Sequence, residues 1–217
     1  MAQKRHIIMI AVTTLLLLIC MFFLYKNVQE NQRYEQFISA QLNESLSELV
    51  TAILANDEIL QQYTSGGRES LLPEQATNLC ANFTTVSTKY NDLLNTAIHL
   101  NKVTQADINP ILGNVAQDIT FFLARSVIGN GLLGDCSMSE STISLDATQS
   151  MKLTEIRELN NQWSEIVKKY VPEATSLGVS EVDWNDLVNH KMWIQLLEEL
   201  SVNSEQSGMT GINRFFN

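Results

Sequence analysis

Residues 7–25 read IIMIAVTTLLLLICMFFLY, an apolar stretch of 19 residues without a charged side chain. The stretch closely follows the basic residues Lys4 and Arg5. At about 1.5 Å per residue, a helix of this length covers about 28 Å, close to the roughly 30 Å thickness of a bilayer's hydrocarbon core. The sequence therefore predicts a transmembrane helix at residues 7–25, preceded by a short cytoplasmic leader at residues 1–6.

A cleaved signal peptide begins in a similar way, but its apolar run is usually about 7 to 15 residues long and ends at a small-x-small site. Here the run is longer and leads into Tyr25-Lys26-Asn27-Val28. Cys20 raises the alternative of a lipoprotein, although the residue before it is Ile19, where that motif normally has a small residue. We therefore interpret the stretch as an uncleaved signal anchor and Cys20 as an apolar residue within it.

Charge predicts the orientation of this helix. Lys4 and Arg5 precede it and Lys26 and Arg33 follow it, so the positive-inside rule gives nearly a tie. From Asn27 onward, the chain has 24 acidic and 11 basic residues, a net charge of −13. Such a body suits export and lacks the clustered Lys and Arg with which proteins bind nucleic acid. We predict a single-pass protein of the cell membrane with a cytoplasmic N-terminus, an extracytoplasmic body and no nucleic-acid partner.

The first segment of the body has the periodicity of a coiled coil. Residues 28–63 contain no Gly or Pro, and a heptad seam runs through Leu42, Leu46, Leu49, Ile53, Leu60 and Tyr63. Asn56 occupies the one skipped seam position, where a polar residue fixes the register or marks a local break. We expect this helix to continue from the membrane helix and to hold the rest of the body close to the bilayer.

Four further segments have helical periodicity. One begins near Pro73, and its seam runs through Leu79, Phe83, Val86, Tyr90, Leu93, Ala97, Leu100 and Thr104. The next opens with a capping box formed by Thr104 and Asp107 and has a wide apolar stripe. The last two are expected at residues 151–171 and from a capping box at residues 180–183 onward.

These segments predict an all-α fold, in which an N-terminal single transmembrane helix is followed by an antiparallel helical bundle of four to five helices. The bundle is expected at residues 27–200, with a polar loop at about 134–150 and a flexible C-terminal tail at 201–217. About 190 residues outside the membrane are sufficient for one sizeable core, so we predict one extracytoplasmic domain.

Two cysteines lie in the body, Cys80 and Cys136. Their spacing excludes a zinc ribbon and a Cys-x-x-Cys redox motif, which leaves a disulfide or two buried free thiols. Short connections make consecutive helices antiparallel, so the start of the second body helix and the end of the third should lie at the same end of the bundle. The two cysteines occupy these places, which favours the disulfide.

The sequence contains no recognisable catalytic constellation. His6, His99 and His190 are isolated from one another and lack the spacing of metal ligands. The acidic residues Glu155, Glu158 and Glu165 are typical of a solvated helix face. We therefore predict no catalytic residue, metal or cofactor, and an enzyme is the least favoured interpretation.

The three tryptophans are the candidate partner contacts, since tryptophan is enriched at interface hot spots. They are Trp163, Trp184 and Trp193, and core packing is the favoured alternative for each. The absence of a reactive cluster favours an interaction protein, a scaffold or accessory subunit of a membrane complex with a protein partner. The seams also leave self-association into a homo-oligomer open.

The alternative function is an extracytoplasmic ligand-sensing module. The extracytoplasmic helix bundles of chemoreceptors and sensor kinases are similar in outline, although no motif is shared. Those modules usually return through a second membrane helix, whereas this chain has no second apolar run of sufficient length. Any signal would therefore pass laterally to a partner.

Overall fold

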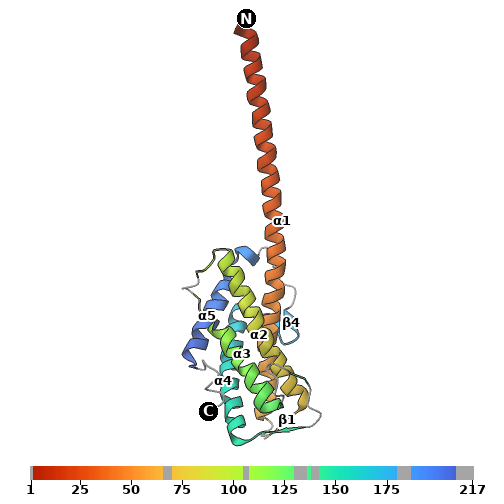
Figure 1. The fold of residues 1–217 in the computed structure, drawn as a ribbon, viewed down its shortest axis with the longest axis vertical. Helices are drawn as coiled ribbons and strands as arrows, with labels where there is room; N and C mark the ends of the chain where they lie inside the picture. Colours follow the sequence, from red (N-terminus) through yellow and green to blue (C-terminus); the bar gives the residue numbers. More distant parts are fainter. Residues whose placement is uncertain are drawn as a thin grey trace.

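A computed structural model describes the chain at residues 2–65, 70–104, 108–129, 136–137, 142–179 and 187–208, and the side chains at 2–8, 10–12 and 64–65 are not described. Within these residues the chain forms five α-helices, two short helices of other types and four strands of two residues each. The prediction of an all-α fold is confirmed (Figure 1).

The first helix, α1 (Ala2–Ser65), is a single helix of 64 residues whose N-terminal part projects from the bundle (Figure 1). The predicted continuity of the helix beyond residue 25 is confirmed. Among the side chains that the structure describes on this helix, Ser39 is the first that is buried, and the stem at residues 26–37 is exposed. Ser39 lies 14 residues beyond Tyr25, a distance of about 21 Å in a helix. The bundle therefore begins beyond a stem that has none of the other described helices packed beside it.

The bundle is a closed ring of helices. Following the ring, α1 packs against α2 (Pro73–His99), α2 against α3 (Ile111–Phe122), α3 against α5 (Met192–Gln206), and α5 against α4 (Ala147–Tyr170). The contact between α4 and α1 closes the ring. The predicted helical bundle is confirmed, and it contains five helices when the C-terminal part of α1 is included.

The predicted seams form much of the core. All six apolar seam residues of α1 are buried, and so is Asn56 at the skipped position. The seam of α2 is buried from Leu79 to Ala97, but the helix ends at His99, five residues before the predicted Thr104. Asn101 adopts a left-handed backbone with φ of 53°, and Lys102 N donates to Ala97 O at 2.9 Å. This Schellman-type arrangement, with asparagine at the left-handed position, terminates the helix.

The end of the bundle farthest from the N-terminus, which we call the distal end, is held by three connections. Strand β1 (Ser70–Leu71) pairs antiparallel with β2 (Ile143–Ser144), and Gln149 Nε2 donates to Ser126 O at 2.5 Å. The Sγ atoms of Cys80 and Cys136 lie 2.03 Å apart, the distance of a disulfide. The prediction that these cysteines lie within bonding distance is confirmed.

Three helices differ from their predicted bounds at the N-terminus. Helix α3 begins at Ile111 rather than directly after the predicted capping box at Thr104, because residues 108–110 are not helical. Helix α4 begins at Ala147 inside the predicted loop, because Asp146 caps it by accepting from Gln149 N at 2.7 Å while Gln149 Oε1 accepts from Asp146 N at 2.8 Å. Helix α5 begins at Met192 after the 3₁₀ helix η2 (Leu187–Asn189). The capping box predicted at residues 180–183 lies outside the described residues, as does Asp107 of the other predicted box.

Three further features complete the fold. Helix α3 continues into the π-helix η1 (Leu123–Ile128), and β3 (Ala174–Thr175) pairs with β4 (Gly178–Val179) in a hairpin beside α1. Helix α5 extends to Gln206, with Ser201 and Ser204 buried, so residues 201–206 of the predicted tail are helical. Within the described residues, the segment Ile111–Ile128 is apolar and long enough to span a membrane, which corrects the expectation that the chain has no second apolar run of sufficient length. More than half of this segment is buried in the bundle.

Candidate functional site

The candidate partner contacts chosen from the sequence lie in the core where the structure describes them. Trp163 and Trp193 have no exposed surface, and Trp163 Nε1 donates to Ser204 Oγ at 3.1 Å. Their burial favours the core-packing alternative. Trp184 lies outside the described residues.

The outer face of α4 is a polar surface at which the bundle is hollowed. The inner side of this helix buries Ile156, Leu159, Trp163 and Val167, whereas its outer side exposes Glu158, Asn161, Gln162, Glu165 and Lys169. Two grooves run along the outer face, one on each side. We call them the α4–α5 groove and the α1–α4 groove, and Gln162 lines both.

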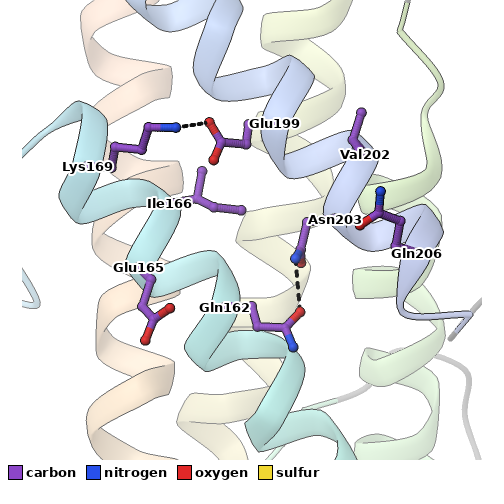
Figure 2. A pocket seen from close by; sticks show the side chains of 8 residues that line it. All are labelled: Gln162, Glu165, Ile166, Lys169, Glu199, Val202, Asn203 and Gln206. Atoms are coloured by element: carbon purple, nitrogen blue, oxygen red, sulfur yellow. Dashed lines mark hydrogen bonds and ion pairs between the residues drawn. The ribbon is translucent and has the colours of Figure 1, made fainter.

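The α4–α5 groove has a volume of about 400 Å³ (Figure 2). Figure 2 shows side chains from both helices along it, and these are Gln162, Glu165, Ile166, Lys169, Glu199, Val202, Asn203 and Gln206. Most of these side chains are charged or carry an amide. The groove therefore offers hydrogen-bond donors and acceptors beside the apolar side chains of Ile166 and Val202.

A charged cluster lies at one end of the α4–α5 groove. Glu199 Oε2 accepts from Lys169 Nζ at 2.6 Å and from Tyr170 Oη at 2.7 Å. The hydrogen bond from Lys169 lowers the pKa of Glu199, and the bond from Tyr170 lowers it further. The same bond to the carboxylate raises the pKa of Lys169. The cluster thus holds α4 and α5 together through charge-assisted hydrogen bonds at the rim of the groove.

An amide pair joins the same helices farther along the groove. Asn203 Nδ2 donates to Gln162 Oε1 at 2.9 Å, as Figure 2 shows. The Oδ1 atom of Asn203 is buried and has no partner among the described residues. A buried acceptor of this kind costs free energy unless it is hydrogen-bonded.

The α1–α4 groove has a volume of about 450 Å³ and is lined by Asp57, Gln61, Arg157, Glu158, Asn161 and Gln162. Asp57 is only 4% exposed. Its Oδ2 atom accepts from Gln61 Nε2 at 3.0 Å and from Ser164 Oγ at 3.1 Å, and it lies 3.6 Å from Lys168 Nζ. Its Oδ1 atom has no partner among the described residues. One oxygen of this carboxylate is thus saturated while the other is left without a donor.

A buried polar layer continues inward from this groove. Asn160 Nδ2 donates to Ile53 O at 3.1 Å, but Asn160 Oδ1 has no partner in the described part of the chain. Asn56, one residue before Asp57, is fully buried, and neither polar atom of its amide is hydrogen-bonded there. The contact between α1 and α4 therefore contains polar groups whose hydrogen-bonding capacity is only partly used.

Sequence reasoning did not identify Asp57, Arg157, Lys169 or Glu199. The consecutive polar residues Asn56 and Asp57 in an otherwise apolar seam were the available signal for the α1–α4 groove. The charged cluster had no such signal, because its members are 29 to 30 residues apart in sequence and belong to two helices.

Within the described residues, no group of three His, Cys, Asp or Glu side chains is placed to hold a metal ion. His99 and His190 are exposed, and the side chain of His6 lies outside the description. No protein-family model matches the chain, and comparisons with curated proteins and with solved structures found no match. The functional argument therefore rests on the residues of the chain itself.

Proposed function

We propose that the protein is a single-pass, membrane-anchored helical bundle that acts by protein–protein interaction, as a scaffold or accessory subunit of a membrane complex. The observation that supports this proposal is the exposure of the apolar side chains in the N-terminal part of the continuous helix α1. Leu15, Phe22 and Leu24 on this helix are 59%, 63% and 66% exposed, whereas Leu49 on the same helix is fully buried. Each Å² of apolar surface left in water costs about 25 cal/mol, so a bilayer around residues 7–25 would stabilise the protein.

The charge of the chain supports an extracytoplasmic bundle. Every acidic residue lies after residue 25, and the part beyond Asn27 has a net charge of −13. The positive-inside rule gives nearly a tie, with Lys4 and Arg5 before the apolar stretch and Lys26 and Arg33 after it, so the acidic body is what favours this orientation. In this orientation the distal end and the outer face of α4 face the extracytoplasmic space.

The outer face of α4 is the proposed contact surface for the partner. It combines unpaired polar groups with two grooves into which side chains of another protein could insert. Leu177, at the tip of the hairpin, is 96% exposed and lines a third groove beside α1. Mixed polar and apolar surfaces of this kind are typical of non-obligate interfaces.

Flotation and alkaline extraction of membranes test the anchor. The full chain should float with membranes and resist extraction, and Leu17→Arg combined with Leu18→Arg should release it, since each arginine costs about 2.5–3.5 kcal/mol at the centre of a membrane helix. Gln29→Arg combined with Gln32→Arg in the stem is the matched control and should leave the protein in the membrane. Release of the unaltered chain by alkaline extraction would exclude an integral anchor.

Labelling of intact cells tests the orientation. A cysteine introduced as Leu177→Cys in a Cys20→Ser background should react with a membrane-impermeant maleimide before lysis. Reaction only after lysis would place the bundle in the cytoplasm and contradict the proposal.

Crosslinking tests the interaction itself. Mild crosslinking of the tagged chain, extraction in detergent and mass spectrometry should identify a specific partner. If this partner persists when residues 7–25 are exchanged for an unrelated membrane helix, recognition belongs to the bundle. If it is lost, recognition belongs to the membrane helix, and the outer face of α4 is not the contact surface.

The alternative function, a ligand-sensing module that signals laterally to a partner, is favoured by one observation. The α1–α4 groove combines a well-defined volume with buried polar atoms that lack partners in the described chain. Such groups are typical of sites that bind a polar ligand.

A further inference from the structure

We propose that the α1–α4 groove binds a small zwitterion of the amino-acid type, whose carboxylate pairs with Arg157 and whose ammonium pairs with the carboxylates of Asp57 and Glu158. This inference rests on the alternative function, a ligand-sensing module, and names the class of ligand that the α1–α4 groove would bind. It rests on the charges, the hydrogen bonds and the volume of the groove.

Arg157 supplies the site for a carboxylate. Its side chain is partly buried and lines the groove, yet its guanidinium makes no hydrogen bond or ion pair with any described residue. Four lysines of the bundle are instead paired with carboxylates, namely Lys89, Lys152, Lys168 and Lys169. A planar guanidinium with five donors matches the two oxygens of a carboxylate and binds them in parallel.

Asp57 and Glu158 supply the site for an ammonium group. Asp57 lines the groove, and three donors surround its Oδ2 atom, while the buried Oδ1 atom has none among the described residues. Glu158 is exposed and makes no hydrogen bond or ion pair with the described chain. An ammonium group carries three donors and can therefore bridge two carboxylates.

The balance of charge selects a zwitterion over a simple ion. The ionisable residues that line the groove are one base, Arg157, and two acids, Asp57 and Glu158. Lys168, 3.6 Å from Asp57 Oδ2, offsets one negative charge. A ligand with both charges leaves this balance unchanged, whereas an isolated anion or cation leaves one side of the groove unpaired.

The size of the groove suits a small molecule. Its volume of about 450 Å³ falls within the 300–1,000 Å³ that is usual for ligand sites. The amides of Gln61, Asn161 and Gln162 line the same volume and can donate to or accept from the ligand. Because Asp57 belongs to α1 and Arg157 to α4, a bound zwitterion would connect the two helices.

Thermal unfolding followed by titration calorimetry tests the proposal. The full chain in lipid nanodiscs is heated with each common amino acid in turn, and every one that raises Tm is titrated. We expect at least one amino acid to bind, while acetate and methylamine, which carry one charge each, bind more weakly. Arg157→Gln should raise the Kd of that amino acid about tenfold or more, as expected when a charge-assisted bidentate pair is lost.

Two further variants make the result specific. Arg33→Gln in the exposed stem makes the same chemical change away from the groove and should leave the Kd unchanged. Asp57→Asn keeps the shape of the side chain, so it should weaken binding of the amino acid but not of acetate. The proposal is overturned if no amino acid binds. It is also overturned if the Arg157→Gln and Arg33→Gln proteins bind equally well while their helical circular dichroism is unchanged. Either result leaves the membrane and partner experiments unaffected.

Discussion

Phe83 of α2 and Trp163 of α4 meet edge to face, with their ring centroids 6.4 Å apart and their planes inclined by 66°. Helices α2 and α4 both border α1 in the ring of helices, so this contact links two segments that are 80 residues apart in sequence. Aromatic pairs of this geometry contribute about 0.5–1.5 kcal/mol beyond the area they bury. The indole of Trp163 also donates to Ser204 of α5, which connects a third helix to the same point.

Trp163→Phe should lower the free energy of unfolding by about 2 kcal/mol. The substitution leaves a cavity and deprives Ser204 Oγ of the indole donor. Urea denaturation monitored by circular dichroism measures the change. The control is Val202→Ala at an exposed position of α5, which should change the free energy of unfolding by less than about 0.5 kcal/mol. Unchanged stability together with weaker partner binding would instead make Trp163 a contact residue.

Asn56→Leu should raise the free energy of unfolding by about 1–3 kcal/mol. Neither polar atom of the buried Asn56 side chain has a partner among the described residues, and an unsatisfied buried polar group costs about this amount. Leucine has the same branching at Cγ, so it fits a similar space. If urea denaturation instead shows that Asn56→Leu is less stable, the amide of Asn56 is hydrogen-bonded in the folded protein. Asn189→Leu, at an exposed position, serves as the control.

Removal of the disulfide should lower the free energy of unfolding by about 4 kcal/mol, the chain-entropy value for a loop of 56 residues. The measurement compares the unaltered protein with Cys80→Ser combined with Cys136→Ser, and only the former should lose stability when a reductant is added. Cys20→Ser is the control, and this protein should still lose stability when the reductant is added. Thiol labelling of the denatured, non-reduced protein should modify Cys20 alone, and three modified cysteines would contradict the bond.

Tyr90 should titrate at unusually high pH. Burial raises its pKa to about 12, and its hydroxyl donates to Asn109 O at 3.2 Å. Because the folded state favours the neutral phenol, this contribution to stability is complete below the ordinary pKa of 10.0 and is lost as the pH rises through about 12. Absorbance at alkaline pH should show a late tyrosine ionisation step. If this late step disappears in the Tyr90→Phe protein, the step belongs to Tyr90.

Glu199→Gln should remove a pH-dependent part of the stability. The pKa of Glu199 is lowered by Lys169 and Tyr170, so its contribution is present above the ordinary pKa of 4.5 and is lost as the pH falls through the lower folded value. Thermal unfolding should therefore show a Tm difference from the unaltered protein at neutral pH that shrinks in acid and in high salt. Glu198→Gln, on the exposed neighbour, should show no such trend.

The helices were predictable because their seams repeat, but several ends were not. The Leu-rich seam of α1 and the aromatic seam of α2 identify both helices and much of the core, since a buried stripe leaves a periodic signal. The early end of α2 depends on the left-handed backbone of Asn101, which no periodicity reveals. The start of α4 depends on the reciprocal bonds between Asp146 and Gln149, within a stretch whose composition resembles a loop.

The candidate site was less predictable than the fold. Asp57 and Arg157 are 100 residues apart in the sequence, and only the packing of α4 against α1 brings them to the same groove. The sequence pointed to the tryptophans as candidate partner contacts because tryptophan is frequent at interfaces. Their large apolar rings, however, stabilise this bundle more when they fill its interior.

The unbroken length of α1 has a mechanical consequence. When the apolar stretch spans a bilayer as proposed, the helix from Tyr25 to Ser65 becomes a lever arm of about 60 Å, given about 1.5 Å per residue. Tilting the membrane segment by about 10° would then sweep the far tip of this arm sideways by about 10 Å, because the helix transmits the rotation without a hinge. A membrane helix adapts to a thinner bilayer in part by tilting, so bilayer thickness would thereby influence how far from its anchor the protein can reach a neighbour.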